Sequence, residues 1–358
     1  MADEHLGYFA PDYRSARDGF LAAAARAGAV VETFENPAPA PDGSPVFTDV
    51  ARLGRADASR VLLLNSATHG VEGFCGSGVL TGLLASGETS AIPENVRLVL
   101  VHAINPHGFA WLRRVTEDNV DLNRNFIDHG VARARNVEYD GLHDVLVPKK
   151  WNAKTIAQCD AKFEDFIRKH SEMALQGAVT RGQYHHADGL FYGGSEATWS
   201  RRTFIDIVER YVAGASDVCF LDFHTGLGRY GAAELIGGGD RARDWFGDGM
   251  PPPRTASSSA PGLGGVIGSA VRKFASDANI TSLTVEFGTY PVREVLRALQ
   301  ADNWLHVHGD VDSKLGREIK ADVRLRLYPD EDDWKEMVWV RARQIVRRAL
   351  RGLAKSSQ

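Results

Sequence analysis

Four short runs of apolar residues constrain the fold of this chain more than any other feature of its sequence. They lie within residues 59–70, 95–108, 216–228 and 280–291. Continuous apolar runs of this length are typical of strands that are buried on both faces, as in parallel sheets. Apolar residues recur at helical spacing over 11–28 and 76–87, and each of these segments is closed by a glycine. Strands that alternate with helices predict an α/β fold with a mostly parallel sheet and helices on both faces.

Three segments fall outside this alternation. The polar stretch at about 127–200, with a helix expected over 160–177, reads as an insertion that walls a site. Residues 237–265 are rich in Gly, Pro and Ser, which predicts a long, mobile loop. A C-terminal helix is expected at about 331–354, because the segment opens with acids and closes with bases, as the helix dipole favours. Its apolar face, which we expect to pack on the rest of a single domain spanning 1–358, would contain Trp334, Val338, Ile345 and Ala349.

The composition argues against several classes of function. The net charge is −4 and no basic cluster tracks phosphates, so we expect no nucleic-acid partner. No apolar run approaches the ~18 residues of a membrane span, and the N-terminal stretch lacks the pattern of a secretory signal. Three sparse cysteines, Cys75, Cys159 and Cys219, are typical of reduced thiols. We therefore expect a cytoplasmic protein that does not bind membranes, and a homo-oligomer stays open.

Polar side chains occur at the carboxyl ends of the four apolar runs. His69, Asn105, His224 and Glu286 each lie at or just beyond the end of one run, and Glu72 follows His69 closely. In open parallel sheets, ligands bind at that edge. Two histidines and a glutamate form a familiar ligand set for catalytic zinc, which keeps a fourth position open for water. The pair His69 and Glu72 is weak evidence alone, but its convergence with His224 predicts a metal site.

Glu286 interrupts the apolar segment "LTVEFGTY". A lone glutamate is costly to bury without a partner, which favours a functional role over a structural one. With an ordinary pKa near ~4.3 it would be ionised at pH 7 and able to accept a proton from activated water. For His224 taken alone, a buried histidine bonded to the backbone is an equally good interpretation.

Five motifs, taken in order, resemble those of the zinc carboxypeptidase family, the carboxypeptidase A-like metallopeptidases. They are "HGVE" (69–72), "NPHG" (105–108), "DLNRNF" (121–126), "DFHTG" (222–226) and "TVEFGTY" (284–290). Each motif alone is weak, but the ordered set is specific. The segment 286–310 further resembles a bacterial branch of this family that is labelled a domain of unknown function. The resemblance implies a twisted mixed sheet inside a three-layer sandwich.

The resemblance also implies a metal centre. One zinc ion would be held by His69, Glu72 and His224, and Glu286 would act as the general base. Asp121 matches an acid that orients the first zinc histidine, and a carboxylate behind a ligating imidazole fixes its tautomer. The resemblance therefore implies a site with one Zn²⁺ ion.

The same resemblance implies a set of substrate-binding residues. Asn123 and Arg124 match the pair that binds a terminal carboxylate, for which an arginine fork is well suited. Arg114 matches an arginine that binds the scissile carbonyl and stabilises its oxyanion. For the neighbouring Arg113 we expect a solvated position on a loop.

The chain departs from the family pattern at two positions. The family places a tyrosine some two dozen residues before the base, whereas here that region reads "SSSAPGLGG" (257–265). Tyr230 and Tyr290 are unranked candidates to replace it. His107 replaces an acid of the Asn-Pro-Asp-Gly turn, with little expected chemical consequence. The missing tyrosine leaves the side-chain specificity open.

Three functions fit these observations. The first is a zinc hydrolase that cleaves an amide bond next to a free carboxylate in a small peptide. The second is a deacylase of N-acyl amino acids, similar to aspartoacylase and succinylglutamate desuccinylase. The third, which the complete set of ligands and base disfavours, is a binding module without catalysis. A second ion would need histidines from a set that we expect to be mostly surface or hydrogen-bonding residues, namely His102, His107, His185, His186, His306 and His308.

Overall fold

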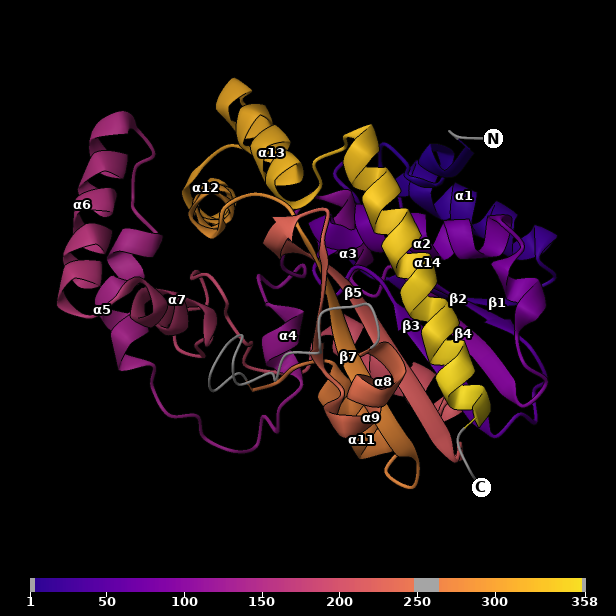
Figure 1. The fold of residues 1–358 in the computed structure, drawn as a ribbon. Coiled ribbons are helices and arrows are strands. Elements are labelled where there is room, and N and C mark those ends of the chain that lie inside the picture. The colour runs from indigo at the N-terminus through magenta and orange to yellow at the C-terminus, as the bar shows by residue number, and fades with distance from the viewer. Residues whose placement is uncertain (1–3, 248–263, 356–358) are drawn as a thin grey trace.

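A seven-stranded mixed sheet forms the centre of the computed structural model, which describes residues 4–247 and 264–355 (Figure 1). The strands are β1 (Val30–Asn36), β2 (Val46–Leu53), β3 (Arg60–Asn65), β4 (Val96–His102), β5 (Asp217–Tyr230), β6 (Ala233–Gly237) and β7 (Asn279–Gly288). Their order is β1-β2-β4-β3-β5-β7-β6. The β4–β3, β3–β5 and β5–β7 pairs are parallel, whereas the β1–β2, β2–β4 and β6–β7 pairs are antiparallel. The four apolar runs therefore form the parallel core, as predicted.

Helices cover both faces of this sheet, which confirms the predicted three-layer architecture. Alternate residues of β3 show the two faces, because Leu62 and Leu64 join one apolar cluster and Val61 and Leu63 join the other. The first face is covered by α1 (Tyr13–Arg26), α2 (Gly73–Ala85) and α14 (Asp332–Lys355). The second face is covered by α8 (Trp199–Tyr211) and α11 (Gly268–Phe274).

The helices of the first face follow from local sequence signals. Helix α1 begins where the Asp12 side chain accepts a hydrogen bond of 2.8 Å from the Ser15 amide, which satisfies a free N–H of the first turn. The expected apolar face of α14 is fully buried, at Trp334, Val338, Ile345 and Ala349. Burial of a side chain as large as that of Val338 or Ile345 stabilises the fold by about 1.5–3 kcal/mol relative to an exposed one. Helix α14 therefore packs on the sheet layer through the predicted face.

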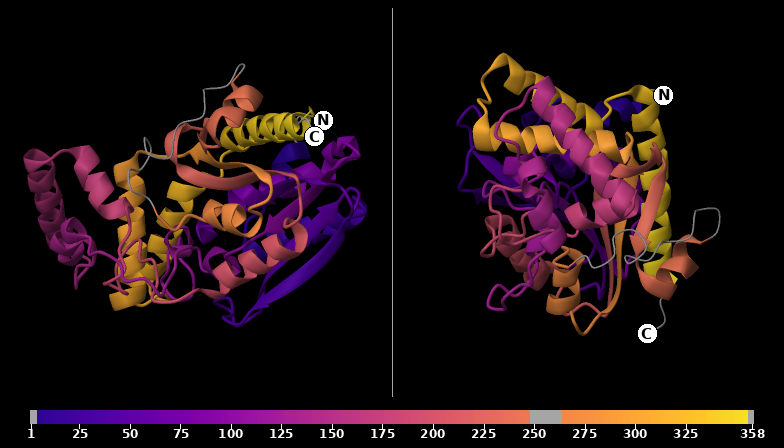
Figure 2. Two further views of the ribbon diagram at one scale, coloured as in Figure 1. Left: turned by 90° about the horizontal axis from the view of Figure 1, so that it is seen from below. Right: turned by 90° about the vertical axis from the view of Figure 1, so that its left-hand side faces the viewer.

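A further group of helices lies to one side of the sheet in Figure 1 and in the left view of Figure 2. It contains α5 (Val137–Leu146), α6 (Ala153–Lys169) and α7 (Glu172–Thr180), which share an apolar cluster with α12 (Val292–His308) and α13 (Lys314–Leu327). The single helix expected over 160–177 is wrong. Helix α6 ends at Lys169, and the Ser171 hydroxyl accepts a 3.0 Å hydrogen bond from the Ala174 amide to start α7. A capping residue inside the periodic pattern divides the helix in two.

The loop expected over 237–265 is also partly wrong. Helix α9 (Gly239–Phe246) occupies its first part, because Phe246 and Ala242 are fully buried against the first face. Residues 248–263 of that segment lie outside the described residues. The remaining short elements are η1 (Glu4–Tyr8), η2 (Gly70–Glu72), η3 (Glu88–Ala91), α3 (Pro106–Ala110) and α4 (Leu122–Asn125). Within 4–247 and 264–355, no helix is long and apolar enough to cross a membrane. The division of the chain into one domain with an insertion stays a prediction.

Candidate metal centre

The tight connection after β3 brings His69 and Glu72 to the carboxyl edge of the sheet. His69 precedes the single turn η2, and Glu72 is its last residue. Gly70 lies so close to the segment after β4 that a Cβ atom there would be 2.0 Å from the carbonyl carbon of Gly108. The glycine is therefore required by the close approach of two backbone segments, and the "HGVE" and "NPHG" motifs are packed together.

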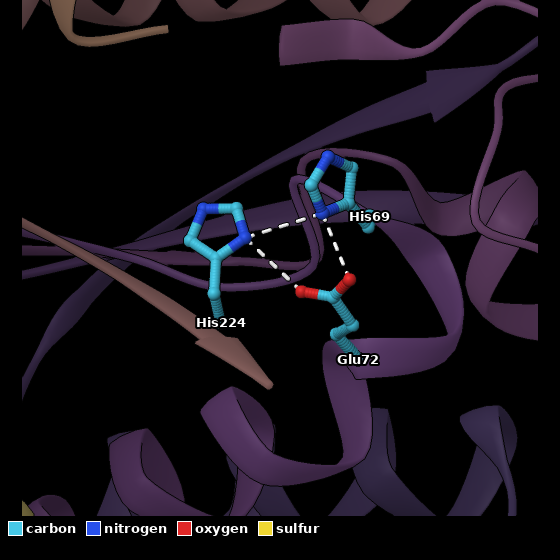
Figure 3. Close-up of side chains that lie close together, drawn as sticks. All are labelled: His69, Glu72 and His224. Atoms are coloured by element: carbon cyan, nitrogen blue, oxygen red, sulfur yellow. Dashed lines mark hydrogen bonds and ion pairs between the residues drawn. The ribbon is translucent and has the colours of Figure 1, made fainter. Parts of the chain in front are cut away.

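The neighbouring parallel strands β5 and β7 supply the next two residues of the site. His224 of β5 is directly beside Glu286 of β7 in the strand register. Figure 3 shows the imidazoles of His69 and His224 facing the carboxylate of Glu72. The Glu72 oxygens lie 2.9 Å from His69 Nδ1 and 3.0 Å from His224 Nδ1, and the two Nδ1 atoms are 3.2 Å apart. All three side chains are buried, and these ligand atoms form a compact group.

Each histidine is held from behind by a buried carboxylate. His69 Nε2 lies 3.2 Å from Asp121 Oδ1, and His224 Nε2 lies 2.5 Å from Asp222 Oδ2. Asp222 is fixed in turn by hydrogen bonds from Asn65 Nδ2 (2.7 Å) and Thr68 Oγ1 (2.8 Å). Carboxylates in this position make the imidazole donate from Nε2 and leave the Nδ1 lone pair for a ligand.

The donor set fits a divalent cation. When both Nε2 atoms donate to carboxylates, each neutral imidazole has a lone pair on Nδ1. The two Nδ1 atoms lie 3.2 Å apart, and both face the oxygens of Glu72. Acceptors that face each other without a hydrogen are repulsive, and buried acceptors without partners are costly. An ion bound by all three groups removes that repulsion. Two histidine nitrogens and one carboxylate are a ligand set that suits zinc.

The pKa shifts show that the site favours a positive charge beside Glu72. Burial alone would lower the pKa of His224, but Asp222 and Glu72 raise it well above its usual value. Burial alone would raise the pKa of Glu72, but His69 and His224 hold it below its usual range. A proton on His224 would therefore take the position that the geometry offers to a cation.

Glu286 lies beside this group with a different environment. Burial, and then repulsion from Glu72, raise its pKa to about 7. Its Oε1 accepts a 2.9 Å hydrogen bond from the Leu227 amide, which fixes the carboxylate at the wall of the cavity. A carboxyl group with a pKa near neutrality can both accept and release a proton.

The neighbouring arginines point to different parts of the molecule. Arg114 donates from Nε to Asp121 (3.1 Å) and from Nη1 to Glu72 (3.1 Å), so it lies in the site. Arg113 was expected on a solvated loop, and this is wrong. Its side chain is buried, and it bonds Asp302 (3.3 Å) and Asn119 (2.8 Å). Sequence spacing alone could not show that successive residues face two interiors.

We call His69, Glu72 and His224 the metal-binding group. Asn123 and Arg124 both line the same cavity as this group. The Asn123 side-chain oxygen accepts a 2.9 Å hydrogen bond from the Ile267 amide. Arg124 donates from Nε (3.1 Å) and Nη2 to the Thr180 carbonyl and from Nη1 to the Asn123 carbonyl (2.9 Å). Three of its five N–H groups are thus bonded to the backbone, and the others remain for a ligand.

The cavity that connects these residues has a volume of about 300 Å³. Its wall includes apolar side chains of α7 and α12, among them Leu175, Val179, Val295 and Leu299. Leu175 and Val179 come from the segment expected to be an insertion. The structure therefore brings all eight predicted site residues to one cavity or its immediate border, with Asp121 as the residue behind His69.

Comparison with known proteins agrees with this architecture. Residues 9–341 match the family described as protein of unknown function (DUF2817). The chain belongs to the DUF2817 family. No curated protein matches the sequence.

Solved structures that resemble the DUF2817 chain include the following three. The crystal structure of thrombin activatable fibrinolysis inhibitor is similar over 100% of this chain and 77% of that chain, with a TM-score of 0.56 and 10% identity. Carboxypeptidase A from Helicoverpa armigera covers 88% of this chain and 72% of its own, with a TM-score of 0.46 and 15% identity. Murein-tripeptide amidase from Escherichia coli O157 covers 81% and 91%, with a TM-score of 0.36 and 15% identity. The first match shows the fold. The family match confirms the predicted membership of a branch labelled as a domain of unknown function.

Neither tyrosine proposed as a replacement for the family's loop tyrosine reaches the cavity in this DUF2817 chain. Tyr230 bonds Asp333 (3.2 Å), and Tyr290 packs under the guanidinium of Arg326. Among residues 4–247 and 264–355, no tyrosine lines the cavity. Most of the segment 257–265 lies outside the described residues.

Sequence reasoning missed Asp222 as a site residue. It stands two positions before His224 on the same strand, so both side chains project from the same face of β5. The spacing Asp-x-His on a buried strand was the available signal. A second missed contact is the amide of Thr225, which donates to Glu72 Oε2 at 3.1 Å.

Proposed function

We propose that the chain is a zinc-dependent hydrolase that cleaves an amide bond next to a free carboxylate in a small peptide. The observation that carries this proposal is the geometry of His69, Glu72 and His224. Their ligand atoms face one another, while each histidine is fixed from behind by a buried carboxylate. A buried arrangement of acceptors of this kind is costly without a cation.

Glu286 would act as the general base. A zinc ion held by His69, Glu72 and His224 would supply a Lewis acid and lower the pKa of water. Glu286, at the cavity wall, would take the proton of the attacking water and pass it to the leaving nitrogen. Its hydrogen bond from the Leu227 amide would keep one carboxylate oxygen in place during both transfers.

The arginines and Asn123 would bind and orient the substrate. Arg114 would stabilise the negative charge that develops on the scissile carbonyl oxygen, because a fixed cation in a buried site lowers the barrier. Its bonds to Asp121 and Glu72 hold the guanidinium against the metal-binding group. Asn123 and the remaining N–H groups of Arg124 would bind the free carboxylate.

The cavity favours a second candidate, a deacylase of N-acyl amino acids. Its volume of about 300 Å³ is at the lower end of the range for small-molecule sites. Helix α7 forms part of its wall through Leu175 and Val179. A small acyl amino acid would fill this space, whereas a longer peptide needs an open side.

A substrate panel tests both candidates. Zinc-loaded protein is assayed on dipeptides, tripeptides and N-acyl amino acids, each with a free and an amidated carboxylate. The peptidase proposal predicts turnover of peptides with a free carboxylate, loss of turnover with a chelator, and recovery with zinc. Exclusive turnover of N-acyl amino acids would favour the deacylase, and activity that survives chelation would contradict both.

A further inference from the structure

A second histidine cluster lies outside the candidate metal centre. His143 of α5 and His186 of the loop that follows α7 stack with ring centroids 4.0 Å apart. Asp188 Oδ1 is 3.0 Å from His143 Nε2, and one ligand atom from each of the three residues lies within 4.8 Å of the others. Both histidines are partly buried, and Asp188 is exposed.

The cluster repeats the pattern of a metal-binding imidazole with a carboxylate behind it. His186 Nε2 lies 2.8 Å from Asp140 Oδ1, and Asp140 is itself held by Arg135 Nε at 2.9 Å. A carboxylate that accepts from Nε2 leaves the other ring nitrogen of His186 as a lone pair. Asp140 and His143 are one helical turn apart on α5, so both face the same loop.

We infer that His143, His186 and Asp188 bind a second divalent transition-metal ion, with zinc as the best match. Two imidazoles and one carboxylate are ligands that zinc prefers, and the fourth position would face solvent. The position is separate from the candidate metal centre, and the inference does not depend on the proposed reaction.

The loop that would be fixed by this ion contacts the catalytic region. Its Tyr184 hydroxyl donates to the Arg124 carbonyl (2.8 Å), and its Tyr192 carbonyl accepts from the Asp121 amide (2.8 Å). The Phe191 ring packs against the guanidinium of Arg114. The loop is closed on itself, because Gly193 N donates to the Gln183 carbonyl at 2.9 Å. The ion would therefore tie the wall of the cavity to α5 and order it.

Zinc stoichiometry in four versions of the full-length protein tests the inference. Metal-free wild-type protein is titrated with Zn²⁺ by calorimetry, and the bound metal is counted after gel filtration. We expect two ions in the wild type, one in the double variant His143→Gln/His186→Gln, and one in the double variant His69→Gln/His224→Gln. His185→Gln is the matched control, because its exposed ring lies next to the cluster without belonging to it, and it should bind two ions.

The outcomes separate the second site from the proposed reaction centre. Equal stoichiometry in the wild type and in the His143→Gln/His186→Gln variant, or binding at that site only near ~1 mM Zn²⁺, would overturn the inference. One ion in the wild type and none in that variant would keep the second site and contradict the catalytic one. If circular dichroism shows that the double variant is unfolded, Asp140→Asn replaces it, with an expected loss of affinity of about 10- to 100-fold.

Hydrogen exchange gives an independent readout. Zinc should slow exchange of the loop amides, including that of Gly193, in the wild type and in His185→Gln. The His143→Gln/His186→Gln variant should show no such protection. Equal protection in that variant would show that zinc acts elsewhere and would contradict the inference.

Discussion

The successive residues Arg113 and Arg114 belong to two different clusters of charged side chains. Arg114 bonds Glu72 in the metal-binding group, whereas Arg113 bonds Asp302 in a second cluster, which we call the Arg113 cluster. In the Arg113 cluster, Lys320 Nζ donates to Asp302 (2.5 Å) and to His306 Nε2 (2.7 Å), and Arg113 donates to Asp302 (3.3 Å). Every one of these contacts joins a donor to an acceptor.

The metal-binding group differs in that some of its contacts join two acceptors. The Nδ1 atoms of His69 and His224 face each other and Glu72, and they lie at a cavity. None of the Arg113 cluster lines that cavity, so far as residues 4–247 and 264–355 show. A cluster in which every contact joins a donor to an acceptor is a structural tie, whereas acceptors that face one another at a cavity indicate a ligand.

The largest expected effect is on turnover, in a variant of Glu286 beside the metal-binding group. Glu286→Gln should lower kcat/KM on the best substrate of the panel by about 10²- to 10⁴-fold, because the amide cannot accept the proton. Zinc binding should persist, since Glu286 is not one of the proposed ligands. Steady-state kinetics and metal analysis of the same sample measure both quantities. Normal turnover in this variant would rule out Glu286 as the base.

The next effect should appear only in stability. Arg113→Ala removes the buried one of the two cations that bond Asp302, and breaking a buried ion pair costs about 3–5 kcal/mol. Urea denaturation of the metal-free protein measures the free energy of unfolding. The folded variant should bind as much zinc as the wild type. A loss below ~1 kcal/mol would mean that the cluster behaves as a surface ion pair.

The Arg113 cluster should also weaken the protein at acidic pH. Burial, and then the Arg113 charge, lower the pKa of His306 to about 3 from an ordinary value near 6.5. The unfolded chain therefore binds more protons than the folded one between these values, so stability falls as the pH drops from about 6.5 toward 3. His306→Gln, which keeps an acceptor for Lys320, should reduce this fall by a few kcal/mol.

Urea denaturation at several pH values compares this variant with the wild type. The exposed His308 of the same helix provides the control, because His308→Gln should leave the fall in stability at acidic pH unchanged. If the free energy of unfolding falls equally with pH in the wild type and in His306→Gln, this histidine does not cause the pH dependence.

The smallest expected effect is on metal affinity and uses a matched pair of variants. Asp222→Asn removes the charge behind His224, which should weaken zinc binding by about 10- to 100-fold. Asp302→Asn makes the same change in the other cluster and should leave zinc affinity unaltered while it lowers stability. Competition with a chromophoric chelator measures both affinities. Equal affinities in the two variants would remove the distinction between the clusters.

The parallel core could be predicted from the sequence because its strands are apolar on both faces. The runs around Leu62 and Leu221 cannot be surface segments. The three strands outside the parallel core, β1, β2 and β6, were not predicted. Of these, the edge strand β1 is largely exposed and leaves a weak signal. The break at His170 and Ser171 was missed because the apolar period continues through it, and only the capping bond stops the helix.

The candidate site could be predicted where a motif falls on a strand end, as with His69, His224 and Glu286. The residues behind it were harder to find, because their role depends on contacts between distant segments. Asp222 reads as part of an apolar strand, and Arg113 reads like Arg114. Only the fold shows that one aspartate faces an imidazole and that two successive arginines face different interiors.

Anomalous diffraction at the zinc edge from a crystal of the zinc-loaded protein tests the central claim most directly. The proposed site predicts an anomalous peak between His69 Nδ1, His224 Nδ1 and the carboxylate of Glu72, with Asp121 and Asp222 still bonded to the outer nitrogens. A fully loaded crystal with no peak among these three residues, or with His69 and His224 bonded only to carboxylates, would contradict it.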